Sequence, residues 1–131
     1  MNYEEIESLL TEAEAKFKIS SYSEAEKLFS YLQQQNPKNT EAVFFLGMSL
    51  FNQKRITEAH SQFKKTTKLD PKNPGGWNAY GATSQELGDT TSALKSFQKA
   101  AQLNPQLDSA HYHLACIYSK QGRFSDAERS F

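Results

Sequence analysis

Residues 77–105 read WNAYGATSQELGDTTSALKSFQKAAQLNP, and the frame set by Ala93, Phe97 and Pro105 recurs along the chain every 34 residues. Its members form three sets: Pro37, Pro71 and Pro105; Ala25, Ala59, Ala93 and Ala127; and Phe29, Phe63, Phe97 and Phe131. A fixed period of this length is typical of a repeat array in which each repeat is one supersecondary unit. Such arrays usually present an extended surface, so the search for function begins with that surface.

Each repeat carries two apolar stripes with helical spacing. In residues 40–73, the first stripe places Val43, Leu46, Gly47 and Leu50 at i, i+3, i+4 and i+7, and a second stripe follows a short polar segment. Because proline disfavours helical backbone in the residue before it, the recurring prolines mark helix ends. The pattern predicts eight helices and no strand, with the helices over residues 3–18, 22–35, 40–53, 56–69, 74–87, 90–103, 108–121 and 124–131.

Capping residues agree with these helix starts. Asn39 and Asn73 precede predicted helices, and Pro74 suits a first helical position, where its missing N–H costs nothing. The same reasoning predicts capping boxes or side-chain caps at Asn2 with Glu5, Ser21 with Glu24, Asp89, and Asp108. We expect Gly88 and Gly122 in the turns between the two helices of their repeats.

Small residues also recur, in the first helix of each pair: Ala13, Gly47, Gly81 and Ala115. A missing or single-carbon side chain lets two helices approach closely, and we expect the recurring phenylalanines to fill the space between neighbouring pairs. Replacing Gly47 with leucine should therefore overpack a helix crossing and cost about 1–3 kcal/mol.

The third repeat resembles the tetratricopeptide repeat, whose pattern is W-x2-L-G-x2-Y…A-x3-F…P. The residues that carry the resemblance are Trp77, Tyr80, Gly81, Ala93, Phe97 and Pro105. Related copies occupy residues 6–39, 40–73 and 108–131, although the first has Lys16 where an aromatic residue is usual. The resemblance implies an all-α fold, a right-handed α-solenoid of antiparallel helix pairs with about 3.5–4 units, forming a single array over residues 1–131.

The fourth repeat departs from the pattern because Phe131 falls in the middle of a second helix. Terminal repeats usually need a capping helix with a polar outer face. We therefore expect a fragment of a longer array. If the array ends here, its uncapped end could instead pair with another copy.

Composition excludes several functional classes. Lysine plus arginine and aspartate plus glutamate both number 15, so no net positive charge favours nucleic acid. The single cysteine, Cys116, allows no internal disulfide and fits a reducing, cytoplasmic location. The N-terminus is acidic rather than signal-like, and no apolar run is long enough to insert into a membrane.

Nothing in the sequence predicts catalysis, a metal or a cofactor. His113 and Cys116 share a helix face, but two ligands are too few for a zinc site, and Cys116 has no plausible base. We expect His111, at a packing position, to be a structural histidine. The chain is predicted to be non-enzymatic.

The predicted functional surface is a second apolar face on the first helices. Phe44, Met48 and Phe51 form a stripe beside the packing residues of residues 40–53. The resemblance places first helices on the concave side, so the predicted groove residues are Leu10, Glu14, Phe17, Phe44, Met48, Phe51, Asn52, Asn78, Ala82, Gln85, Tyr112 and Cys116. The alternative is that these side chains are covered by neighbouring helices or by another array.

The predicted partner is a protein or peptide with an apolar anchor, laid into the groove as an adaptor binds its ligand. Some tetratricopeptide domains hold chaperone C-termini with a lysine, arginine and asparagine clamp. Here Leu10, Glu14, Phe44 and Gly75 stand at such places, and nearby acids would repel a carboxylate, so that partner class is not expected. Two alternatives remain open: a recruiting segment of a larger enzyme, such as a glycosyl- or sulfotransferase, and a self-assembling scaffold.

Overall fold

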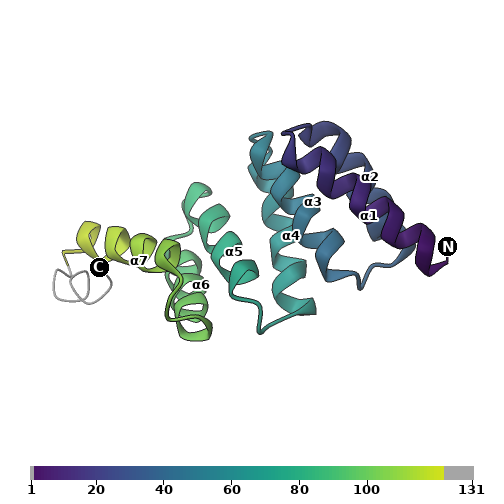
Figure 1. Cartoon of the computed structure of the whole chain (residues 1–131). Coiled ribbons are helices and arrows are strands. Elements are labelled where there is room, and N and C mark those ends of the chain that lie inside the picture. The colour runs from purple at the N-terminus through teal and green to yellow at the C-terminus, as the bar shows by residue number, and fades with distance from the viewer. Residues whose placement is uncertain (1, 123–131) are drawn as a thin grey trace. The chain divides into compact units, whose positions relative to one another are not determined.

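A computed structural model describes residues 2–122, and within them the chain forms seven α-helices and no strand. Figure 1 shows helices in succession, each joined to the next by a short connection. Their bounds are α1 Tyr3–Lys18, α2 Tyr22–Gln35, α3 Thr40–Asn52, α4 Ile56–Leu69, α5 Pro74–Glu86, α6 Thr90–Leu103 and α7 Asp108–Lys120. Seven of the predicted helices are confirmed, to within one residue at each end. The eighth, over 124–131 with Ala127 and Phe131, lies outside the described residues.

The chain divides into two compact units, one ending at Leu69 and the other beginning at Asp70. In the first unit each helix packs on the next, α1 on α2, α2 on α3 and α3 on α4. In the second unit α5 packs on α6 and α6 on α7. Each unit therefore contains at least one complete helix pair.

Side-chain caps begin four helices. The Oδ1 atoms of Asn2, Asn39, Asn73 and Asp89 accept backbone N–H groups at 2.9, 3.2, 2.9 and 3.1 Å, which confirms these predictions.

Two cap predictions are wrong. Ser21 makes no side-chain cap bond, and the Glu24 carboxylate, which would complete the box, instead pairs with Lys16 at 2.8 Å. Asp108 is the first helical residue rather than the cap, and Leu107 precedes it. The Asp108 carboxylate therefore acts only as a negative charge in the first turn, where it is favourable to the helix dipole.

The predicted close approach at Gly47 is confirmed. A Cβ atom placed there would lie 2.6 Å from Cε1 of Phe63, whose side chain is fully buried. At Gly81 the corresponding distance to Cε1 of Phe97 is 2.9 Å. These two rings lie against the glycine of their own helix pair, a contact that the prediction did not include.

The phenylalanine side chains at this repeated position also contact the next helix pair. The ring of Phe29, on α2, stacks on that of Phe45, on α3, with centroids 5.6 Å apart. Phe97, on α6, stacks in the same way on His113, on α7, at 4.5 Å. One phenylalanine position thus serves both contacts, and this explains why phenylalanine recurs there.

The turn inside each repeat has a left-handed residue at the same phase. Gly88 and Gly122 have φ values of +83° and +74°, and Ser20 and Lys54 hold the equivalent places with φ values of 64° and 66°. Glycine adopts this backbone without a steric penalty, whereas side chains with a Cβ do not. The first two repeats therefore store strain that the later two avoid.

In the second unit, one side chain of α5 and one of α7 each contact the backbone carbonyl of a recurring proline. Nε1 of Trp77 donates to the carbonyl of Pro71 at 2.7 Å, and Nε2 of His111 lies 2.9 Å from the carbonyl of Pro105. Because a carbonyl only accepts, His111 must carry a proton on Nε2. This contact supports the structural role predicted for that histidine.

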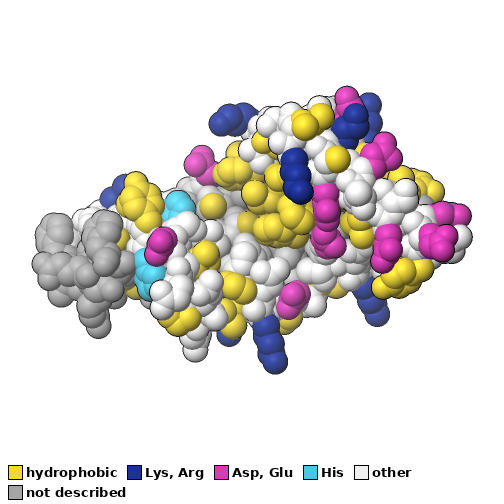
Figure 2. All heavy atoms as spheres, viewed as in Figure 1, with side chains coloured by type: hydrophobic (Ala, Val, Ile, Leu, Met, Phe, Trp, Pro, Cys, Tyr) yellow, Lys and Arg dark blue, Asp and Glu magenta, His cyan; other side chains and the backbone are white. Residues whose placement is uncertain are grey.

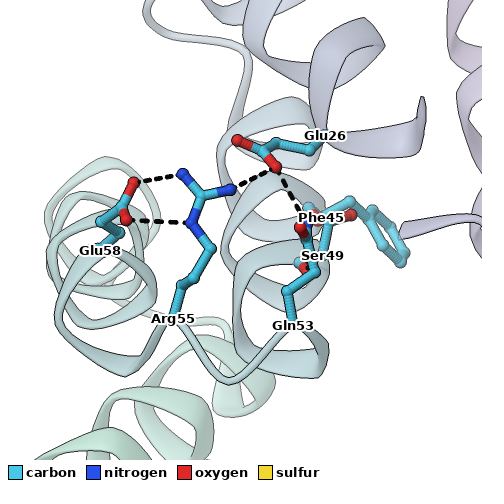
Figure 3. Close-up of polar contacts among 6 residues, drawn as sticks. All are labelled: Glu26, Phe45, Ser49, Gln53, Arg55 and Glu58. Atoms are coloured by element: carbon cyan, nitrogen blue, oxygen red, sulfur yellow. Dashed lines mark hydrogen bonds and ion pairs between the residues drawn. The ribbon is translucent and has the colours of Figure 1, made fainter. Parts of the chain in front are cut away.

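Arg55 links the first two repeats (Figure 3). Its guanidinium makes two bonds to Glu58, at 3.0 and 2.6 Å, and one to Glu26 on α2 at 2.6 Å. Gln53 donates to the same Glu26 oxygen at 2.9 Å. The guanidinium lowers the pKa of Glu58 through its hydrogen bonds and charge. The bidentate pair with Glu58 orients the guanidinium at the start of α4, and its single bond to Glu26 joins this end of α4 to α2.

Candidate partner-binding surface

The apolar stripe on α3 is the main element of the candidate surface in the first unit. Phe44, Met48 and Phe51 are half-buried, and Asn52 beyond them is exposed. Hydrophobic side chains gather, with acidic ones beside them, in the region of Figure 2 where Figure 1 draws α3. Residual exposure of large apolar side chains in one patch is a common property of interaction sites.

Phe44 also has a packing role. Its ring makes an edge contact with Phe45 at 5.4 Å and a tilted contact with Phe63 at 5.9 Å between centroids. Helix packing thus covers part of this ring, as the alternative interpretation of the stripe expected. Met48 and Phe51 make no aromatic contact of this kind among the described residues. They are the better probes of the surface.

Residues of α1 and α3 line a pocket of about 230 Å³. Glu14, Phe17 and Lys18 line it from α1, and Glu41 and Phe45 from α3. The rings of Phe17 and Phe45 meet edge to face, with centroids 5.5 Å apart. The predicted groove residues Glu14 and Phe17 are therefore brought together with three residues that the prediction did not include.

The two carboxyl groups of this pocket interact directly. A hydrogen bond with Glu14, partial burial and the Glu14 charge together raise the pKa of Glu41 to about 7. Two carboxylates this close cannot both ionise freely, so the pair retains a proton to near neutral pH.

The remaining first-unit predictions are placed as follows. Leu10 is half-buried on α1. The Asn52 amide donates to the Met48 carbonyl at 2.8 Å, within its own helix. Part of the hydrogen-bonding capacity of Asn52 is thus already used.

In the second unit, Asn78 on α5 donates to Oγ of Ser109 on α7 at 2.7 Å, while its Oδ1 is buried and has no hydrogen-bond partner in the described part of the chain. Ala82 packs partly buried against the core cluster that contains Phe97 and Leu114. Gln85 is half-buried.

Tyr112 and Cys116 lie on α7. The Tyr112 side chain is 59% exposed and meets the His113 ring edge to face at 5.7 Å between centroids. Cys116 is a half-buried free thiol. Burial lowers the pKa of His113. This arrangement is an exposed aromatic side chain beside a neutral imidazole.

Sequence reasoning missed Glu41 and Phe45 as members of the candidate surface. The missing signal was the pairing between successive first helices, which brings together residues somewhat less than one repeat apart. Asn78 with Ser109 is a second example of such a pair. The pairs Glu14–Glu41, Phe17–Phe45 and Asn78–Ser109 are 27, 28 and 31 residues apart, so the offset locates the facing residue to within about one helical turn.

Within residues 2–122, no group of three or more histidine, cysteine, aspartate or glutamate side chains could hold a metal ion. In the same range no helix is long and apolar enough to cross a membrane.

The antiparallel helix pairs, the small-residue crossings and the repeated turns define an α-solenoid protein of the tetratricopeptide class. A family model described as "Anaphase-promoting complex, cyclosome, subunit 3" matches residues 18–100, and a model described as "TPR repeat" matches residues 85–122. The chain therefore belongs to the tetratricopeptide repeat family, and within it to the group that the first model describes. This family match supports a protein-interaction scaffold in general, without naming a partner.

Several curated relatives match more than half of this chain. The N-terminal acetyltransferase A complex subunit-like protein of Schizosaccharomyces pombe is 26% identical over 83% of this chain and 16% of its own length. Cell division cycle protein 27 homolog A of Arabidopsis thaliana is 27% identical over 92% of this chain and 17% of its own length. The chain thus spans about a sixth of the length of these two relatives.

Among solved structures, a crystal structure of MamA has a TM-score of 0.90 and covers 96% of this chain and 74% of its own. The two sequences are 17% identical, so the likeness is one of fold.

Proposed function

We propose that this chain is a non-enzymatic adaptor that binds a partner protein through an apolar segment, with the α3 stripe as its main contact. The observation that carries the proposal is the half-burial of Met48 and Phe51 beside Phe44 on one helix face. Full burial of an exposed side chain of this size gains about 1.5–3 kcal/mol, and these half-buried side chains would gain the part that corresponds to their remaining exposed area, so covering the stripe is favourable. A helix laid in by its apolar face is the partner that fits this geometry.

The polar residues of the first helices would add hydrogen bonds to such a segment. On α3 the candidate is Asn52. On α5, in the second unit, the candidates are Asn78 and Gln85, which would contact a segment bound to that unit. In this proposal Leu10 contributes apolar contact area on the first unit, and Tyr112 and Cys116 contribute it on the second, each unit taken by itself.

Selection from a random peptide library displayed on phage would test the proposal. Wild-type chain should enrich peptides with apolar residues at i, i+3, i+4 and i+7, and Met48→Glu should weaken the selected peptides by at least tenfold, on the order of 1.4 kcal/mol. Tyr31→Glu, at an exposed position on α2, is the matched control and should retain binding. Peptides that bind the Met48→Glu variant as tightly as wild type would place the functional surface elsewhere.

A second candidate is that these repeats recruit a partner or substrate for a larger protein that contains them, including a larger enzyme. It is favoured by one observation, that curated relatives are about six times longer than the region they share with this chain. The sequence of the complete gene product tests it directly. A complete product consisting of tetratricopeptide repeats alone would exclude it.

A third possibility, self-assembly through the C-terminal end, concerns residues beyond Gly122, outside the described part of the chain. Sedimentation at several protein concentrations, with and without an added capping helix, would test it. A constant monomer mass would rule it out.

A further inference from the structure

The pocket between α1 and α3 differs in chemistry from the apolar stripe next to it. Its aromatic side chains, Phe17 and Phe45, are half-buried, and its acidic side chains, Glu14 and Glu41, come from two different helices. Both helices belong to the first unit, so the pocket is complete within that unit.

The two carboxyl groups lie close enough to hydrogen-bond, although negative charges on a protein surface repel each other. Lys18 also lines the pocket, yet no ion pair joins it to either carboxylate among the described residues. The raised pKa of Glu41 leaves the pair with one shared proton and one negative charge near neutral pH, and no cation of the described chain is paired with that charge. A cation that reached this position would replace that proton.

The aromatic rings favour the same kind of occupant. Positive charge near an aromatic face gains about 0.5–2 kcal/mol, and the aliphatic part of a long basic side chain packs well against such rings. A neutral apolar side chain would leave the remaining negative charge of the pair without a cation, and an acidic one would be repelled.

We propose that this pocket binds the cationic side chain of a lysine or arginine on the partner segment, adjacent to the apolar residues that cover Met48. The inference rests on the proposed function and adds a requirement to it, namely a basic residue beside the apolar anchor. The charge complementarity of Glu14 and Glu41, together with the flanking Phe17 and Phe45, is what selects this occupant.

Side-chain analogues test the pocket without a known partner. We would titrate isotope-labelled chain with n-butylammonium and n-butylguanidinium chloride, with n-butanol as the neutral control, and follow amide shifts by NMR. The cations should give saturable shifts at Glu14, Phe17, Glu41 and Phe45, and n-butanol should not. Since the cation displaces a proton, the groups that set the pH dependence are Glu14, Glu41 and Lys18. Affinity should rise up to about tenfold from pH 6 to pH 8.

Glu14→Gln and Glu41→Gln should each abolish the saturable shifts, and Glu7→Gln, the same charge change elsewhere on α1, should leave them intact. Equal shifts from n-butanol, or no saturation with either cation, would overturn the inference using wild-type chain alone, even if a variant fails to fold. Peptide binding through Met48 in a chain whose pocket ignores cations would overturn the inference and leave the proposed function standing. Cation binding in a chain that selects no peptide would support the pocket as a cation site and overturn the proposed function.

Discussion

The imidazole of His113 lies flat on the ring of Phe97, with centroids 4.5 Å apart and planes 11° from parallel. Phe45 holds the same place against Phe29 in the first unit, at 5.6 Å and 18°. A stacked position that takes phenylalanine in one repeat thus takes histidine in another. Burial there disfavours the imidazolium and lowers the pKa of His113.

His113 should make stability depend on pH in the acidic range. A histidine with a lowered pKa in the folded chain binds fewer protons folded than unfolded, so its contribution is present above the unfolded value of about 6.5 and is lost as pH falls through the folded value. His113→Phe should therefore remove part of the fall in melting temperature between pH 7 and pH 5. His60→Phe is the comparison, and an identical pH profile in wild type and His113→Phe would contradict the assignment.

Gly47→Ala should destabilise the chain even though alanine is the better helix former by about 1 kcal/mol. The new Cβ would meet the buried Phe63 ring at 2.6 Å, and we expect a net cost of about 1–3 kcal/mol by denaturant unfolding. Gly47→Leu should cost at least as much. The Phe63→Leu background, which makes space beside Gly47, should reduce the cost of Gly47→Ala, and additivity of the two changes would disprove the contact.

Lys54→Gly should stabilise the chain by about 0.5–1 kcal/mol, because φ at Lys54 is 66° and glycine relieves the strain despite its greater unfolded-state entropy. The reciprocal change, Gly88→Lys, should destabilise by a similar amount, since φ there is +83° and nothing lies near a Cβ at that site. Thermal unfolding of both variants measures the pair. A loss of stability in Lys54→Gly would show that the turn tolerates the lysine without strain.

Glu41→Gln should stabilise the chain above neutral pH. A carboxyl group with a pKa of about 7 in the folded chain takes up a proton on folding, so wild-type stability falls as pH rises from about 4.5 to 7 and stays low above it. With solvent screening of this partly exposed group, we expect a gain on the order of 1 kcal/mol at pH 8 and little at pH 5. Glu7→Gln is the control, and an equal gain at both pH values would argue against the proton-sharing pair.

The fold could be predicted because its determinants are local and repeated. Apolar spacing, asparagine caps and the prolines each indicate the same helix boundaries, so an error at one position is corrected by the same position in another repeat. The exceptions are Ser21 and Asp108, where the capping sequence is present but the side chain makes no cap. At Ser21 the Glu24 half of the expected box is replaced by the pair with Lys16 on the preceding helix, a contact that the local sequence does not indicate.

The candidate surface was predicted less completely because it depends on contacts between repeats. The phase of a residue indicates its helix face, and this was enough to single out Glu14, Phe17 and the α3 stripe. Which residue of the next first helix comes to meet them depends on the helix crossing, and this brought in Glu41 and Phe45. Phe44 also packs on Phe63, and this contact depends on how α3 and α4 cross within their own pair.

The hydrogen bonds from the Trp77 and His111 side chains to the proline carbonyls have a consequence for susceptibility to proteases. Each hydrogen bond joins the loop that carries a recurring proline to the helix after it. At the equivalent position of α3 the residue is Val43, whose side chain has no donor for the loop that carries Pro37. Lys38 and Lys72 occupy the same place in their loops, one residue after the proline. Trypsin should therefore cleave after Lys38 faster than after Lys72. The loop that contains Lys38 can separate from the following helix, whereas the Trp77 indole holds the loop that contains Lys72.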